Sequence, residues 1–193
     1  MAEGVLKVAF KEWATVVEAL GNGQPSIILR KGGIHEKGGQ FSPEHSSFLL
    51  FPTFEHQNKE DLRPEFWNFL EKENEWEAST RDKIPFKYFA KLEISWELMD
   101  PGRLSKFSSF HIWSEKALRK RFEYGKEKNV FLMLVRIFRL PVISSIEHRP
   151  SYGGCKSWVT LKDEVSIKNA TPVISNDTFM RLKKTLEKRI EDL

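Results

Sequence analysis

Residues 86–98 read FKYFAKLEISWEL, and apolar and polar side chains alternate along them. The even positions are all apolar, whereas five of the six odd positions carry Lys, Glu or Ser. Side chains of a strand point alternately to its two faces, so this pattern predicts a long strand with one buried and one solvated face. Such strands are typical of antiparallel or mixed sheets. The stretch therefore favours a fold built on a sheet of that kind.

Other apolar stretches supply further strands. Residues 26–30 and 157–161 are short apolar stretches that predict buried strands, and residues 48–54 predict another. Pro52 confines the last of these to a sheet edge or a strand end, because proline lacks the N–H that a central strand needs. Residues 130–140 are apolar on both faces, which is typical of a central strand.

Helical spacing predicts three helices. Residues 8–20 place apolar side chains three and four positions apart, and the Gly-Asn-Gly that follows ends the helix. Residues 64–76 predict a second helix, with a proline in its first turn. A final helix over residues 176–192 begins with Asn176 or Asp177 as its cap.

Together these elements predict an α+β fold. We expect a mixed, mostly antiparallel sheet, curved or barrel-like, that is flanked by helices. Neither repeats nor linkers divide the sequence, so we expect one domain over residues 1–193. A helical insertion around residues 59–80 and a C-terminal helix complete it.

The composition excludes several classes of protein. The 193 residues carry 31 Lys+Arg and 27 Asp+Glu, a net charge of +4, and are 40% hydrophobic, which excludes a disordered or collagen-like chain. The single cysteine, Cys155, forms no internal disulfide and is too few for a cysteine-built zinc site. No apolar run is long enough to span a membrane, and residues 1–4 lack the features of a signal peptide. We therefore expect a cytoplasmic protein without membrane contact.

The charges are unevenly distributed. Residues 113–129 carry six basic and three acidic side chains, and the last helix adds more cations. A basic face of this kind neutralises phosphate groups, or it is simply the solvated face of a helix. Residues 59–77 carry seven acidic and three basic side chains. They suit docking on a basic partner, which leaves a protein-interaction module as one hypothesis for the function.

A glycine-rich stretch surrounds the first two candidate binding residues. Six of the eleven glycines lie in residues 21–39, next to Arg30 and Lys31. Closely spaced backbone N–H groups beside two cations suit an anion, although a Gly-Gly pair is equally typical of a tight turn.

Four more residues are candidates for binding an anion or a base. Arg136 and Arg139 interrupt an apolar strand, so each either pairs with an acid such as Glu18 or Glu93 or lines a pocket. Lys156 and Trp158 follow a Gly-Gly turn, where a cation beside an aromatic ring suits a stacked base. Trp158 fits the core equally well.

Two Glu-His pairs, Glu44-His45 and Glu55-His56, bracket an apolar strand. Both residue types are metal ligands, but a strand of this length holds its ends roughly 25 Å apart at ~3.3 Å per residue. One metal ion therefore cannot bind both pairs unless the chain turns at Pro52, and we predict neither a metal nor another cofactor. The alternative is a metal-assisted phosphodiesterase or nuclease-like enzyme that uses these four residues.

Several strings resemble a known family. They are KEWA (11–14), VEAL (17–20), LRKGGI (29–34), FLLFPT (48–53), EHQ (55–57) and YGGCKSWV (152–159). They are similar to the bacterial family of domain of unknown function 1802. The resemblance implies a place in a restriction or defence system, since some members are associated with restriction-type nuclease domains. The chain lacks the D…E-x-K signature of such nucleases, because residues 91–93 read KLE, the reverse order. It thus resembles the non-cleaving part of such a system, with a restriction-type nuclease as partner.

A second resemblance concerns the start of the chain. A helix, then Gly-x-Gly-Gln, then a strand that ends in Arg30 is similar to the opening of PUA-like and ASCH-type domains, small β-barrels that bind RNA or modified bases. This resemblance implies a nucleotide pocket formed by residues already singled out: Arg30, Lys31, Arg136, Lys156 and Trp158. We therefore predict a non-catalytic accessory domain that recognises DNA or RNA.

Overall fold

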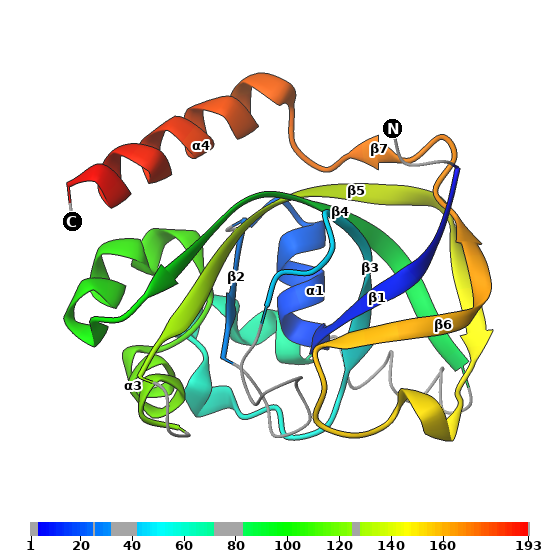
Figure 1. The fold of residues 1–193 in the computed structure, drawn as a ribbon, viewed down its shortest axis with the longest axis horizontal. Coiled ribbons are helices and arrows are strands. Elements are labelled where there is room, and N and C mark those ends of the chain that lie inside the picture. Colours follow the sequence, from blue (N-terminus) through cyan, green and yellow to red (C-terminus); the bar gives the residue numbers. More distant parts are fainter. Residues whose placement is uncertain (1–3, 25, 32–41, 72–82, 125–127, 193) are drawn as a thin grey trace.

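One curved sheet organises the protein in the computed structural model, which describes residues 4–24, 26–31, 42–71, 83–124 and 128–192 (Figure 1). Six strands follow the order β2-β5-β4-β3-β1-β6, and β7 pairs with β5 beside them. The strands are β1 (Val5–Trp13), β2 (Ile27–Arg30), β3 (Ser47–Thr53), β4 (Lys83–Leu98), β5 (Val130–Glu147), β6 (Trp158–Ser166) and β7 (Thr171–Pro172).

Helices flank this sheet. The α-helices are α1 (Ala14–Gly21), α3 (Glu115–Glu123) and α4 (Asn176–Glu191). Short 3-10 helices are η2 (Lys59–Asp61), η3 (Pro64–Phe66), η4 (Pro101–Phe110) and η5 (Pro150–Tyr152). Figure 1 shows α4 at the top of the molecule, next to η4, with α3 at the bottom.

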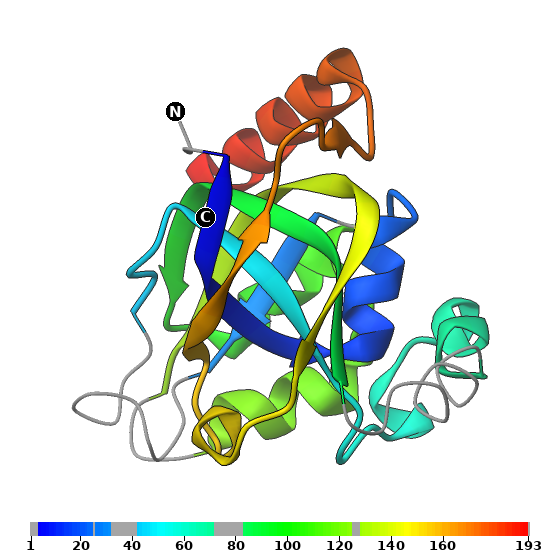
Figure 2. The same cartoon turned by 90° about the vertical axis from the view of Figure 1, so that its right-hand side faces the viewer.

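The sheet is mixed and mostly antiparallel, as the sequence predicted. β1 runs parallel to β3, and every other pairing among the described strands is antiparallel. β4 and β5 form the longest pair, and their register shifts between Phe86 and Tyr88 and again between Leu92 and Ile94. Such bulges bend a strand and increase its twist. Figure 2 shows the resulting curvature, which brings β5 into contact with β6.

Two apolar clusters pack on the two faces of this sheet. Phe48 and Leu50 belong to the larger cluster, with the helices, whereas Leu49 and Phe51 belong to the smaller one. Neighbouring residues of a strand point to opposite faces, so the alternation assigns each cluster to one face. Pro52 stands next to the end of β3, as predicted.

The prediction of a helix over residues 8–20 is wrong in its first half. Those residues belong to β1 up to Trp13, and only α1, which follows at once, is helical. The physical reason is tertiary: β3 and β6 pair with β1 on its two sides and satisfy its backbone hydrogen-bonding groups. Over so short a stretch, apolar residues at positions 10, 13 and 14 are compatible with the spacing of a helix and also with a buried strand.

Two other helix predictions need correction. The cap of α4 is Ser175, whose hydroxyl accepts a hydrogen bond from the Thr178 N–H, and neither Asn176 nor Asp177 caps it. Residues 64–76 begin as η3 and continue as helix over 67–71, and the remainder lies outside the described residues. The segments η4 and α3 had no counterpart among the predicted elements.

Gly21 is the last residue of α1, and the Tyr88 side chain fills the space that a side chain at this position would need. An added Cβ would lie 2.1 Å from Cζ of Tyr88, whose ring is buried, and the Gly21 carbonyl accepts a hydrogen bond from Arg139. We expect Gly21→Ala to destabilise the protein by about 1–3 kcal/mol in urea denaturation, because the clash outweighs the gain of about 1 kcal/mol that alanine brings to a helix. Tyr88→Leu should remove most of the added cost in a double-mutant cycle. Additive effects of the two substitutions would contradict this account.

Candidate functional site

Arg30 joins two segments that are far apart in the sequence. Its Nε donates a hydrogen bond of 2.7 Å to Oγ of the buried Ser157, so the end of β2 lies beside the turn that precedes β6. These ends, with the end of β1, lie near the lower centre of Figure 1. Two predicted binding segments, around residue 30 and around residues 156–158, therefore meet here.

Aromatic rings surround this contact. The Arg30 guanidinium lies 5.2 Å from the Phe10 ring centre, and the Phe10 ring meets Trp158 edge-on at 4.8 Å. Phe48 and His45 also contact the Trp158 ring, at 5.1 and 4.9 Å. The guanidinium of Arg30 and the indole of Trp158 are thus placed on one aromatic cluster.

Two lysines add positive charge beside Arg30. The Lys11 ammonium donates to the carbonyl oxygen of Gly154 at 3.1 Å, and that of Lys156 to Ser151 at 2.6 Å. Burial lowers the pKa of Lys11; the charges of Lys156 and Arg30 lower it further, and the charge of Glu55 opposes them. Lys11 therefore lies close enough to Lys156 and Arg30 to be repelled by both, and an incoming anion would relieve this repulsion.

Lys31 is turned toward α3 instead. Its ammonium donates to the carbonyl oxygens of Asn129 at 3.0 Å and Phe122 at 3.4 Å. The ring of Phe122 lies 5.8 Å from the same ammonium. These contacts hold Lys31 in the wall between β2 and α3.

Arg121 of α3 reaches the same end of the sheet. Its guanidinium lies 3.4 Å from the Trp113 ring centre, and Nη1 donates to the Leu29 carbonyl at 3.2 Å. Its pKa is lowered to about 10, chiefly by burial; the charge of Glu12 opposes the shift and the charge of Arg30 contributes to it. Arg121 therefore stays charged at neutral pH and interacts with both groups.

Glu12 is the most deeply buried acid near these cations. Its exposed fraction is 2%; Oε1 accepts the Trp13 N–H at 2.8 Å, and Oε2 has no hydrogen-bond partner in the described part of the chain. No ion pair within 4.0 Å links it to a cation of the described ranges. A buried carboxylate oxygen without a donor is costly, so this atom needs an explanation.

Arg30 and the neighbouring Lys11, Glu12, Arg121, Lys156, Ser157 and Trp158 are called the Arg30 cluster below. Arg136 and Arg139 do not join this cluster. Arg30 pairs with Phe131 in β5, and five further residues along a strand place Arg136 roughly 17 Å away at ~3.3 Å per residue. Nη1 of Arg136 donates to the Asn176 side chain at 3.0 Å, and Nη2 of Arg139 to the Gly21 carbonyl at 2.8 Å. Internal partners therefore hold both guanidinium groups.

The acids that were considered for these arginines have other partners. Glu18 pairs with Lys87 at 2.7 Å, and Glu93 pairs with Lys183 at 3.4 Å. The polar contacts of Arg136 and Arg139 instead go to an amide and a backbone carbonyl.

The four residues of the metal hypothesis are not gathered into one site. Glu44 and His45 precede β3, whereas Glu55 and His56 follow it. His45 lies against Trp158, and the other pair is exposed. Within residues 4–24, 26–31, 42–71, 83–124 and 128–192, no three His, Cys, Asp or Glu side chains are grouped so that they could hold a metal ion.

The acidic segment of the interaction hypothesis has an internal contact. Glu60 in η2 forms an ion pair of 2.7 Å with Lys116 of α3, and both side chains are exposed. Residues 72–77 of that segment lie outside the described residues. No helix in the described ranges is both long and apolar enough to cross a membrane.

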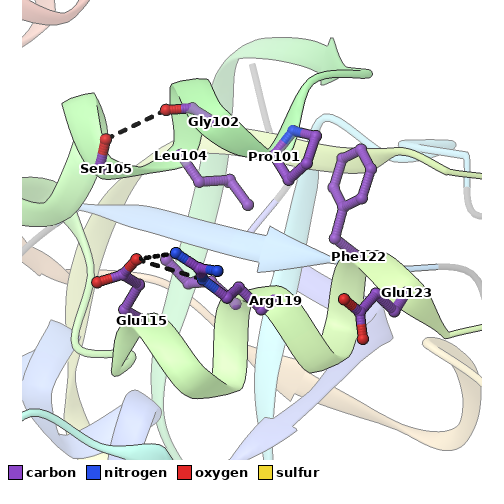
Figure 3. Close-up of a pocket in the computed structure, with 9 residues that line it drawn as sticks. Pro101, Gly102, Leu104, Ser105, Glu115, Arg119, Phe122 and Glu123 are labelled. Atoms are coloured by element: carbon purple, nitrogen blue, oxygen red, sulfur yellow. Dashed lines mark hydrogen bonds and ion pairs between the residues drawn. The ribbon is translucent and has the colours of Figure 1, made fainter.

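A separate cavity lies between η4 and α3 (Figure 3). Its volume is about 400 Å³, and Leu104, Leu118 and Phe122 contribute apolar walls. The side chains of Glu115 and Arg119, which also line it, form an ion pair of 2.7 Å. None of the predicted binding residues lines this cavity.

Three members of the Arg30 cluster were not predicted from the sequence, and Arg121 was predicted only as part of a basic stretch. The missed residues are Lys11, Glu12 and Ser157. A usable signal was present for Glu12: in β1 it stands two positions after Phe10, so it is a charged residue on an apolar face. The helix prediction for residues 8–20 concealed it.

Comparisons with known proteins found one family and one group of structures. The family model described as domain of unknown function (DUF1802) matches residues 9–185. The crystal structure of ASCH from Zymomonas mobilis is 16% identical, with a TM-score of 0.47, over 80% of this chain and 87% of that one. A point mutant of the same protein is 17% identical, with a TM-score of 0.47, over 80% and 89%. No curated protein matches.

Proposed function

We propose that this chain, which belongs to the DUF1802 family, recognises nucleic acid through the Arg30 cluster and changes no bond itself. In this proposal the whole chain acts as one domain in the cytoplasm, and its partner is DNA or RNA. From the family resemblance we further propose that the protein belongs to a restriction or defence system. A restriction-type nuclease partner would carry out the cleavage there.

The guanidinium of Arg30 is the observation that carries this proposal. Ser157 holds Nε in place, and the described residues offer no acceptor to the two terminal nitrogens. A guanidinium fixed at one nitrogen and open at the others is prepared to hold a phosphate or a base edge. Lys11 and Lys156 add the positive potential that attracts a phosphate backbone.

Aromatic rings favour nucleic acid over a simple anion. Trp158 and His45 are both partly exposed and lie edge to face at 4.9 Å beside the cations. Bases stack on such rings, while basic side chains neutralise the phosphates on either side. A site for inorganic phosphate alone would need the cations but not the rings.

Binding to fluorescent oligonucleotides tests this function. Single- and double-stranded DNA and RNA should be compared by fluorescence anisotropy at low and near-physiological salt. We expect binding that weakens steeply with salt, because released counterions drive it. Arg30→Ala should weaken the best ligand about tenfold or more and, if Arg30 contacts a phosphate, reduce the salt slope by about one.

Arg181→Ala is the matched control, because Arg181 is an exposed arginine on α4, far from the lower end of β2 in Figure 1. It removes the same charge and should leave affinity within about twofold. Thermal melting of both variants separates a binding defect from a folding defect. Absence of binding at low salt, or equal losses in the two variants, would rule out the Arg30 cluster as the interface.

A further inference from the structure

Glu12 lies on the same sheet face as the Arg30 cluster. It stands two positions after Phe10 in β1, and residues two apart in a strand share a face. The Arg30 guanidinium lies over the Phe10 ring, which places it on that face too. The carboxylate and the guanidinium therefore belong to one site.

The unpaired oxygen of Glu12 indicates that a ligand supplies the missing hydrogen-bond donor. Oε1 is satisfied by the Trp13 N–H, but Oε2 has no donor among the residues that the structure describes, and Glu12 is only 2% exposed. Leaving a buried acceptor unpaired costs the full price of its desolvation, so native proteins rarely do so. A ligand that brings an N–H group would satisfy it.

Two guanidinium groups accompany this acceptor. Arg121 uses Nη1 on the Leu29 carbonyl and has further nitrogens without an acceptor among the described residues. Its guanidinium lies 5.9 Å from the ring centre of Trp13, the residue after Glu12, and donates to the carbonyl of Leu29, the residue before Arg30, so the three groups are neighbours. The site thus offers one acceptor and two sets of donors.

A nucleobase that complements this set must present one donor and two acceptors on one edge. Cytosine does so with its 4-amino group, N3 and O2. Guanine presents one acceptor and two donors, uracil presents one donor between two acceptors, and adenine has a single ring acceptor beside its amino group. Pairing of a carboxylate with the cytosine amino group is a recognised mode of reading this base.

We propose that Glu12, Arg121 and Arg30 recognise an unpaired cytosine, with Glu12 accepting from its amino group and the arginines donating to N3 and O2. This inference rests on the proposed nucleic-acid binding. The base edge that is read is hidden in a duplex, so the ligand is single-stranded or carries an extruded base. The partly exposed ring of Trp158, which packs on the buried Phe10, supplies the aromatic surface beside it.

The test compares three single-stranded oligonucleotides of one length, made as DNA and as RNA. One contains only cytosine, one only uracil, and one 2-pyrimidinone, which is cytosine without its amino group. At fixed salt, the wild-type protein should bind the cytosine strand about tenfold tighter than either of the others. Glu12→Gln should abolish this preference, since an amide no longer offers a charged acceptor.

Glu164→Gln is the control, because Glu164 is an exposed carboxylate on β6 that pairs with Lys7. It should keep the cytosine preference. Equal wild-type binding of all three strands would overturn the cytosine inference and leave the proposed function standing, whereas no binding of any strand would overturn both. If Glu12→Gln fails to fold, the comparison of cytosine with 2-pyrimidinone still decides, because it needs only the wild-type protein.

Discussion

Trp113→Ala is expected to destabilise the protein by about 3–5 kcal/mol, the range found when a large buried aromatic is truncated. The Trp113 side chain is 1% exposed and packs edge-on against Trp13 at 4.7 Å. It also carries the Arg121 guanidinium on its face at 3.4 Å. The substitution therefore opens a cavity and removes the support of a buried charge. Urea denaturation gives the difference in unfolding free energy directly.

Two comparisons make this prediction specific. Trp113→Phe keeps a ring for Arg121 and should cost clearly less than the alanine variant. Trp67→Ala is the matched control, because Trp67 is a partly exposed tryptophan after η3 whose Nε1 donates to backbone carbonyls. It should cost less, since less of its surface is buried. A loss below about 1 kcal/mol for Trp113→Ala would show that the site tolerates the loss of this ring.

The central strands were predictable because their own side chains show which faces are buried. β4 follows the alternation of residues 86–98, and β5 follows the continuous apolar stretch at 130–140. These patterns arise from local exposure, which the sequence records directly. The strand ends were less predictable: β5 extends to Glu147, because Ile84 to Phe86 of β4 pair with Ser144 to Ile146. That pairing depends on a partner strand far away in the sequence.

The site was predictable where its residues come from turns. Arg30 and Trp158 were singled out because each stands beside glycine-rich sequence, and a hydrogen bond from Arg30 to the neighbouring Ser157 joins the two segments. Arg136 was grouped with them by residue type alone, but position along β5 decides its surroundings. Glu12 was missed because its strand was predicted as a helix. The contacts that define the site link positions more than one hundred residues apart, which local patterns do not record.

His111 makes the stability depend on pH. It is 1% exposed, and its Nδ1 accepts the Trp113 N–H at 3.2 Å. Burial, helped by the charges of Arg63 and Arg121, lowers its pKa from 6.5 to about 3. The folded state therefore keeps this imidazole neutral, while the unfolded state binds a proton below pH 6.5. Stability is complete above that pH and falls as the pH drops toward 3.

The expected loss attributable to His111 is about 2 kcal/mol between about pH 7.5 and pH 5, at 1.36 kcal/mol for each pH unit below the unfolded pKa. Urea denaturation at the two pH values measures it. His111→Gln removes the titration but keeps an acceptor for the Trp113 N–H, so its unfolding free energy should fall by about 2 kcal/mol less over the same interval. Carboxylates titrate equally in both proteins and cancel in this difference. An identical pH dependence of wild type and variant would contradict this account and would mean that His111 binds a proton in the folded protein.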